Sequence, residues 1–233
     1  MINSRQPTTL KSRQSGLSVV GLLLGVSISM VSILASLSLY TNHHISSSES
    51  MRGSAYNFQI TQSMVFFNRE IPTAGFGLED DGLDDIAVTG GTGTVSVYWR
   101  YRDGNNIVCR GLRENETSRN SKPYRALTIR EATICCSDTE SFGTMTWLPV
   151  ATIAHWRVDA PLAAYLADSS NVNGTLFEFS VGGAQVCVPY NAIDLTTVEA
   201  HPSVSITAPT LAQLSGNTTV GATSANVCLP NIL

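Results

Sequence analysis

The chain has 233 residues, a formal net charge of −4, and 14% charged against 43% hydrophobic residues. A mean hydropathy of +0.08 excludes an intrinsically disordered chain, and the length allows one ordinary globular domain plus an extended element rather than two full domains. The surplus of acidic residues also disfavours nonspecific binding to DNA phosphates.

The N-terminal region predicts a membrane segment. Residues 17–40 contain no charged side chain, and a helix of that length would measure about 36 Å, enough to cross a hydrocarbon core of about 30 Å. The charges before it are all positive, at Arg5, Lys11 and Arg13, which favours a cytoplasmic N-terminus and export of the rest of the chain. A cleaved secretory signal peptide is disfavoured, because its apolar region would span only about 7 to 15 residues. A signal anchor of an unspecialised membrane protein fits the composition equally well.

The start of this apolar run resembles the processing site of type IV pilins and type II secretion pseudopilins. Residues 13–20 read RQSGLSVV, a basic leader that ends in glycine and is followed by a hydrophobic helix. The resemblance implies that prepilin peptidase cuts after Gly16 on the cytoplasmic side and that Leu17 becomes the methylated N-terminus. Residues 1–16 would then be a leader peptide, and the helix would remain in the inner membrane.

A second resemblance covers residues 66–77, which read FFNREIPTAGFG. This segment is similar to the part of PilW-type minor pilins where a helix with an arginine, acidic and isoleucine triplet ends in an Ala-Gly-Phe turn. A looser match covers residues 95–101 and 106–109, where that group has a strand, a short turn and its first cysteine. The chain therefore resembles a PilW-type minor pilin.

Position 21 departs from the pilin pattern. Pilins usually carry a buried glutamate at the fifth mature position, paired with the N-terminal amine of a neighbouring subunit, and the corresponding residue here is Gly21. Because an unpaired carboxylate is costly in an apolar bundle, loss of the glutamate implies that no partner amine is needed. In the pilin families the subunit type without this glutamate lies at the filament tip, so the resemblance implies a place at or near the tip. Chance loss of a dispensable pairing is the alternative.

Residues 41–71 are predicted to be the amphipathic half of the same helix, ended by Pro72. Glycines and serines between residues 21 and 38 favour close helix packing in lipid, so residues 17–40 are expected to be the transmembrane or filament-core half. The apolar residues of the second half recur at spacings closer to a helix than to a strand: Met51, Tyr56, Phe58, Ile60, Met64, Phe67 and Ile71.

Residues 72–233 are predicted to form a β-rich domain in the periplasm. The clearest strand is 95–101, where apolar and polar residues alternate with a period of two. A short helix is expected at 160–167, and residues 90–93 are expected to form a hairpin turn rather than a phosphate loop. The predicted fold class is α+β, a long N-terminal helix packed on one antiparallel sheet. Weaker strand patterns cover 127–134, 144–158, 176–188 and 204–207.

The five cysteines all lie in the part of the chain that is expected to be exported, where an oxidising compartment allows disulfides. The pilin resemblance implies a bond between Cys187 and Cys228. A bond from Cys109 to Cys135 or Cys136 would close a loop of about 26 residues and contribute roughly 3 kcal/mol. One thiol would then remain. A vicinal Cys135–Cys136 bridge or a zinc site is possible but disfavoured by strain and by the spacing.

The chain offers few candidates for chemistry. The acidic segment 79–85 contains Asp80, Asp81, Asp84 and Asp85, whose oxygens are the kind that bind Ca²⁺, but the spacing does not fit an EF-hand and favours a solvated loop. The histidines are isolated or adjoin the membrane segment, and no hydrolase or metalloprotease motif is present, so neither a cofactor nor an enzymatic activity is expected. No nucleic-acid partner is predicted. A local basic patch would still allow nucleic-acid binding, and its residues would be Arg100, Arg102, Arg110, Arg113 and Arg119.

The leading hypothesis is a minor pilin in the inner membrane that joins other minor pilins and the major pilin, helps to prime a type IV pilus and lies near its tip. It would act by helix packing rather than by catalysis, and its partners would include prepilin peptidase. One alternative is a pseudopilin of a type II secretion system, which would have the same kind of leader and the same membrane-spanning helix. Another is an adhesin or ligand-binding module that uses the pilin helix as its anchor.

Overall fold

The structure is a computed structural model, and it divides the chain into two compact units, Met1–Met51 and Arg52–Leu233. The boundary lies inside the long first helix, so each unit is described by itself. The residues described are 18–78, 83–133, 140–186, 200–217 and 219–232.

The first element is a continuous helix, α1, of 52 residues from Val19 to Glu70. It is long and apolar enough in its N-terminal part to cross a membrane, and the side chains of that part are exposed. The helix predicted over residues 17–71 is therefore confirmed, with its ends placed at these residues. Pro72 ends it as predicted, within the short 3₁₀ turn η1 (Ile71–Thr73).

Within the second unit, α1 buries one face at helical spacing. The buried residues of this stretch follow one another at intervals of one to four positions: Gly53, Tyr56, Ile60, Ser63, Met64 and Phe67. Two apolar residues assigned to this face by sequence are exposed instead, Met51 at 71% and Phe58 at 68%. The reason is geometric, because Phe58 lies two residues from both Tyr56 and Ile60, so a helix turns it away from their face.

A five-stranded antiparallel sheet follows, with its strands in chain order. The hairpin turn predicted at residues 90–93 is confirmed, since the first strand ends at Gly91 and the second begins at Thr94. Gly93 has a φ of +74°, a conformation that side chains with a Cβ rarely adopt. The strands are β1 (Ile86–Gly91), β2 (Thr94–Asp103), β3 (Asn106–Arg119), β4 (Lys122–Ala132) and β5 (Trp147–Arg157), and the turn η2 (Leu83–Asp85) precedes them.

A second, three-stranded antiparallel sheet completes the domain. Two sheets therefore replace the single sheet expected from sequence. The helix predicted at 160–167 is confirmed as α2 (Ala160–Leu166), capped by the Asp159 carboxylate, which accepts from the Leu162 N–H. The second sheet comprises β6 (Glu178–Val186), β7 (Ala200–Ala208) and β8 (Thr223–Cys228), with the short helix α3 (Leu211–Leu214) between the last two.

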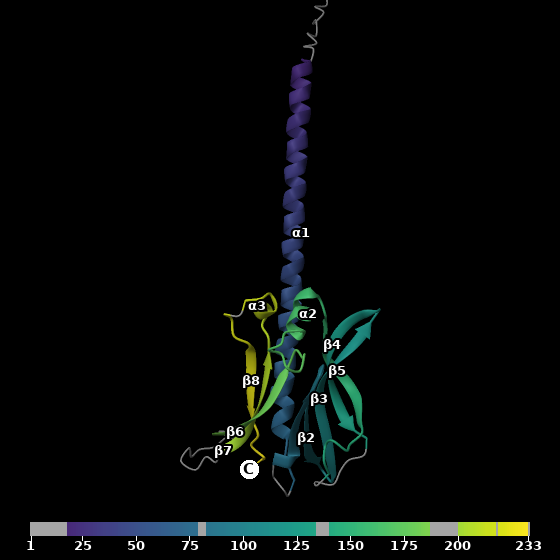
Figure 1. Cartoon of the computed structure of the whole chain (residues 1–233), viewed down its shortest axis with the longest axis vertical. Coiled ribbons are helices and arrows are strands. Elements are labelled where there is room, and N and C mark those ends of the chain that lie inside the picture. Colours follow the sequence, from purple (N-terminus) through teal and green to yellow (C-terminus); the bar gives the residue numbers. More distant parts are fainter. Residues whose placement is uncertain (1–17, 79–82, 134–139, 187–199, 218, 233) are drawn as a thin grey trace, which may run out of the picture. The chain divides into compact units, whose positions relative to one another are not determined.

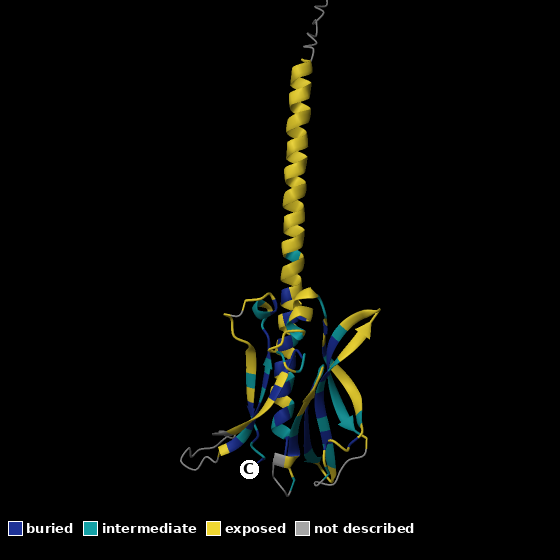
Figure 2. Cartoon of the chain, viewed as in Figure 1, coloured by how far each residue is buried: buried dark blue, intermediate teal, exposed yellow. Residues whose placement is uncertain are grey.

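One hydrophobic core joins the second half of α1 to both sheets. Phe67 is fully buried and stacks on Phe179 of β6, with their ring centroids 6.0 Å apart. Figure 2 shows this buried stretch of α1 between strands whose outward residues are exposed. A second, smaller cluster lies on the other face of the five-stranded sheet, where Tyr98 packs against Phe142 and Met145. Both faces of β2 are consequently buried at this point, whereas the sequence predicted one.

Candidate functional site

The apolar half of α1 carries glycines and serines, and four of its serine hydroxyls are hydrogen-bonded within the helix. The hydroxyls of Ser27, Ser29 and Ser32 each donate to the carbonyl oxygen four residues earlier, at 2.7 to 2.9 Å. Apart from the backbone of the helix itself, a Cβ added at Gly21 or at Gly25 would meet no atom of the described residues within 4 Å. These hydroxyls can therefore enter an apolar environment with their hydrogen bonds already formed, and the glycines leave room for a close approach by another helix.

The predicted processing residues, Gly16 and Leu17, lie outside the described residues. Gly21 is described and lies on the exposed surface of α1. Among the described residues nothing requires a glycine at this position, because a Cβ there would meet no other side chain or segment.

The end of α1 is fixed to the C-terminal segment of the chain. Asn231 donates from Nδ2 to the carbonyl oxygen of Pro72 at 2.8 Å. Gly75 has a φ of +76°, and a Cβ there would lie 2.6 Å from the carbonyl oxygen of Asn231. Its N–H donates to the Arg100 carbonyl oxygen at 2.9 Å. The Ala-Gly-Phe turn therefore needs glycine both for its backbone angle and for the close passage of another segment.

Glu70 forms ion pairs with two arginines at the same helix end. Its carboxylate lies 2.9 Å from Arg69 and 3.0 Å from Arg110 of β3. Glu70, the acidic residue of the triplet noted in the sequence, therefore connects the last turn of α1 to the sheet.

Arg100 of β2 is buried, 2% exposed, and holds the segment before β1 against the sheet. Its Nε lies 3.2 Å from a carboxylate oxygen of Asp85, and it donates to the carbonyl oxygens of Asp84 at 3.0 Å and Glu140 at 2.9 Å. The guanidinium also lies over the Phe142 ring, 4.6 Å from its centroid.

This arrangement corrects the interpretation of one residue of the acidic segment, Asp85, as part of a solvated loop, whereas Asp84 is exposed. Asp85 is 2% exposed and faces an arginine, so it is a buried partner of the sheet rather than a solvated residue. Asp80 and Asp81 lie outside the described residues. Over the part of the chain that the structure describes, no group of three or more histidine, cysteine, aspartate and glutamate side chains is arranged to hold a metal ion.

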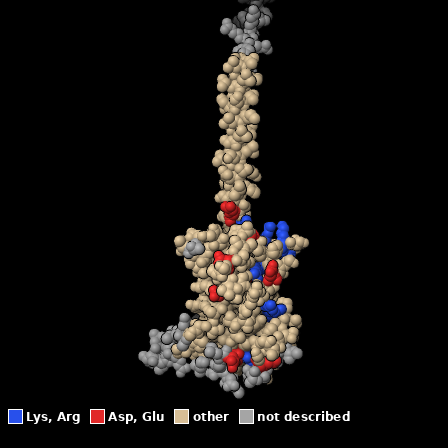
Figure 3. All heavy atoms as spheres, viewed as in Figure 1, with Lys and Arg blue, Asp and Glu red and all other residues tan. Residues whose placement is uncertain are grey.

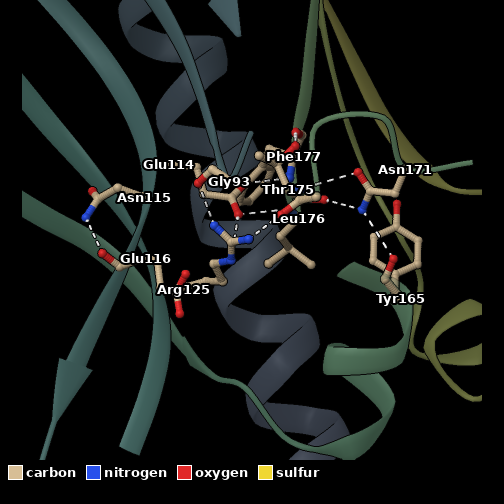
Figure 4. Close-up of polar contacts among 11 residues, drawn as sticks. Gly93, Glu114, Asn115, Glu116, Arg125, Tyr165, Asn171, Thr175, Leu176 and Phe177 are labelled. Carbon is tan, nitrogen blue, oxygen red and sulfur yellow. Dashed lines mark hydrogen bonds and ion pairs between the residues drawn. The ribbon is translucent and has the colours of Figure 1, made fainter. Parts of the chain in front are cut away.

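A second buried ion pair connects the two sheets. Glu114 of β3 is fully buried, and its two oxygens accept from the N–H groups of Leu176 and Phe177, at 2.8 and 2.7 Å, just before β6. Arg125 of β4 lies 3.8 Å from Glu114 and donates to the carbonyl oxygens of Gly93 and Gly174. Figure 4 shows the two side chains between the hairpin turn and the α2–β6 connection.

Burial raises the pKa of Glu114 from 4.5 to about 7, against the lowering effect of the two backbone N–H groups and Arg125. Burial likewise raises the pKa of Tyr56, whose hydroxyl donates to the Pro209 carbonyl oxygen at 2.7 Å. These contacts fix loops to the core, and their polar atoms point inward. They are structural features rather than parts of a site.

Two of the five cysteines are described, and neither Cys109 nor Cys228 is a free thiol. Both are disulfide-bonded. Cys135, Cys136 and Cys187 lie outside the described residues, so the expected pairing stays a prediction.

The basic residues grouped by sequence do not form one patch. Arg100 is buried and Arg110 is held by Glu70, whereas Arg113 and Arg119 line a groove on the outer face of the five-stranded sheet. The groove has a volume of about 900 Å³ and crosses β3, β4 and β5. Sequence analysis did not find it, because its residues come together only through the strand register.

No protein-family model, no curated protein and no solved structure matches the chain. What the structure shows is a pilin-like architecture, a long N-terminal apolar helix that leads into an antiparallel β domain. Two surfaces are candidates for function, the exposed apolar half of α1 and the groove on the sheet.

Proposed function

We propose that the chain is a pilin-like filament subunit, a minor pilin that is anchored in the inner membrane by α1 and helps to prime a type IV pilus. The observation that carries the proposal is the two-part character of α1, a single helix of 52 residues. Its first half is apolar, free of charge and exposed, and its second half buries one face in the core of a β domain. A helix that served only as a membrane anchor would not need to continue into the core of the exported domain.

The apolar half suits assembly by helix packing. The hydroxyls of Ser27, Ser29, Ser32 and Ser36 bond to carbonyl groups of the same helix, so two such helices could meet through these small residues with those polar groups already satisfied. The basic leader that ends at Gly16 supports processing by prepilin peptidase. The same residues fit the partners proposed from sequence, other minor pilins and the major pilin.

We also propose that the subunit lies at or near the tip of the filament. Gly21 stands where a shaft subunit would bury a glutamate against the N-terminal amine of a neighbour, and beyond the helix backbone no atom of the described residues lies within 4 Å of a Cβ placed there. A subunit without that glutamate needs no amine in a neighbouring subunit.

Immunogold microscopy of sheared pili tests this place in the filament. Gold confined to filament ends is the expected result, and gold distributed along the shafts would contradict a tip position. Gly21→Glu supplies the missing carboxylate, and because the chain itself offers no clash there, we expect the melting temperature of the domain to be unchanged while incorporation along the shaft increases. Gly21→Ala, which adds only a methyl group, is the matched control and is expected to stay at filament ends.

A further inference from the structure

The groove on the outer face of the five-stranded sheet, called the sheet groove below, is distinct from the residues that pack the core. Along β3 the inward residues Leu112 and Glu114 are fully buried, and Arg113 between them points to the opposite face. The register places Arg113 opposite Thr128 of β4, which in turn lies opposite Thr152 of β5. The groove therefore runs across three neighbouring strands.

The sheet groove is basic. Three arginines line it, Arg113, Arg119 and Arg130, against one acidic residue, Glu116. None of these arginines takes part in an ion pair with another described residue. Figure 3 shows basic side chains over the part of the sheet where β4 is labelled in Figure 1.

Five other arginines of the domain have carboxylate partners among the described residues, so the three groove arginines differ from them, although Arg102 and Arg157 outside the groove also form no such pair. Arg52 pairs with Asp159, and the buried and half-buried arginines described above pair with Asp85, Glu70 and Glu114. The Nε of Arg113 is buried and has no hydrogen-bond partner among the described residues. Guanidinium groups bind carboxylates and other flat oxyanions with two parallel hydrogen bonds, so the groove is complementary to an anionic ligand.

The remaining lining residues are hydrogen-bonding and aromatic. Tyr124 and His155 lie side by side with their ring centroids 6.0 Å apart, and threonine hydroxyls lie along β4 and β5. An aromatic face beside hydroxyl groups and guanidinium groups suits a ligand with apolar C–H faces, many hydroxyls and a few negative charges.

The charge density distinguishes between classes of polymer. Arg113 and Arg119 are six residues apart on β3, which is about 20 Å at 3.3 Å per residue. Duplex DNA would present roughly one negative charge per 1.7 Å over that length, far more than three guanidinium groups neutralise, in a chain whose net charge is already −4. A polymer with sparse charges matches the groove better.

We propose that the sheet groove binds an acidic oligosaccharide, with its carboxylates on Arg113, Arg119 and Arg130 and one sugar ring on Tyr124. This binding goes beyond the proposed filament assembly and does not depend on it, because it is measured on the purified chain. The interaction is noncovalent and involves no reaction.

The test uses the full-length chain in detergent micelles and isothermal titration calorimetry. The probe is a hyaluronan hexasaccharide, and its matched control is the same hexasaccharide with the carboxylates reduced to alcohols. A single-stranded DNA 12-mer is titrated under the same conditions. We expect saturable binding of the acidic hexasaccharide with a stoichiometry near one, and binding of the reduced form at least tenfold weaker.

Variants locate the binding. Arg119→Gln and Arg130→Gln are each expected to raise the dissociation constant at least fivefold, whereas Arg69→Gln, which removes the same charge from a helix residue outside the groove, leaves it unchanged. Tyr124→Ala is expected to weaken binding and Tyr124→Phe to retain it, because the ring face is kept. Melting temperatures within about 2 °C of wild type verify that each variant is folded.

Three results would overturn the proposal. The first is no saturable heat with the acidic hexasaccharide. The second is equal affinity for its reduced form, which would remove the role of the arginines. The third is tighter binding of the DNA 12-mer with the same sensitivity at Arg119 and Arg130, which would make the groove a nucleic-acid site instead.

Discussion

Glu114 combines complete burial with an ionisable group, and this makes the stability of the domain depend on pH. The folded chain raises the pKa of Glu114 from 4.5 to about 7, so the folded state holds the proton more tightly than the unfolded state does. Its contribution to stability is therefore greatest below about pH 4.5 and is lost as the pH rises through 7. The shift corresponds to about 3 kcal/mol at most.

We predict that Glu114→Gln removes this dependence. Gln keeps the shape of the side chain and accepts from one of the two N–H groups of Leu176 and Phe177. The free energy of unfolding of the variant should therefore differ from that of the wild type by a constant amount plus a part that changes with pH, because Gln does not titrate. Denaturant unfolding of both proteins between pH 4.5 and 8 measures the difference. The advantage of the wild type should shrink as the pH rises, and a difference that stays constant across this range would rule out a titrating Glu114.

The signal for this buried pair is present in the sequence but easy to overlook. Glu114 follows Leu112 by two residues, so a strand puts both on the same, inward face. What the sequence does not reveal is the partner, because Arg125 and the N–H groups before β6 come from segments 11 to 63 residues away. Asp85 and Arg100 were missed for the same reason, and a cluster of acidic residues was interpreted as solvated.

At the scale of elements, the helix and the local turns were the most predictable parts. The end of α1 at Pro72, the hairpin turn at Gly93 and the α2 helix each depend on residues within a few positions of one another. By contrast, β1, β3 and β8 were not predicted as strands. The division of the strands into two sheets is a property of long-range pairing, for which the local pattern of a strand contains no information.

The two phenylalanines on α1 give a direct test of which face is buried. Phe67 is 0% exposed and stacks on Phe179, whereas Phe58 is 68% exposed. Phe67→Ala is expected to lower the free energy of unfolding by about 3 to 5 kcal/mol, because it removes buried surface and leaves a cavity. Phe58→Ala, the matched control on the same helix, should change it by less than about 0.5 kcal/mol.

Chemical denaturation of the detergent-solubilised chain measures both changes. Equal effects of the two substitutions would mean that the helix packs on the domain through a different face. A loss of stability confined to Phe58→Ala would place Phe58 rather than Phe67 in the core.

For the whole molecule, the α+β class and the long N-terminal helix were predicted and are confirmed. The features that bear most on function are the leader, Gly21 in place of a glutamate, and the sheet groove. The first two were found from sequence because they depend on residue order. The third was not, since it depends on which strands pair.

The proposed function depends most directly on processing at Gly16. N-terminal mass spectrometry of the chain, isolated from cells with and without prepilin peptidase, measures it. The account predicts a mature protein that begins with N-methylated Leu17 when the peptidase is present and an intact leader when it is absent. An intact residue 1–16 segment in cells that contain active peptidase would contradict the assignment of this chain as a pilin-like subunit.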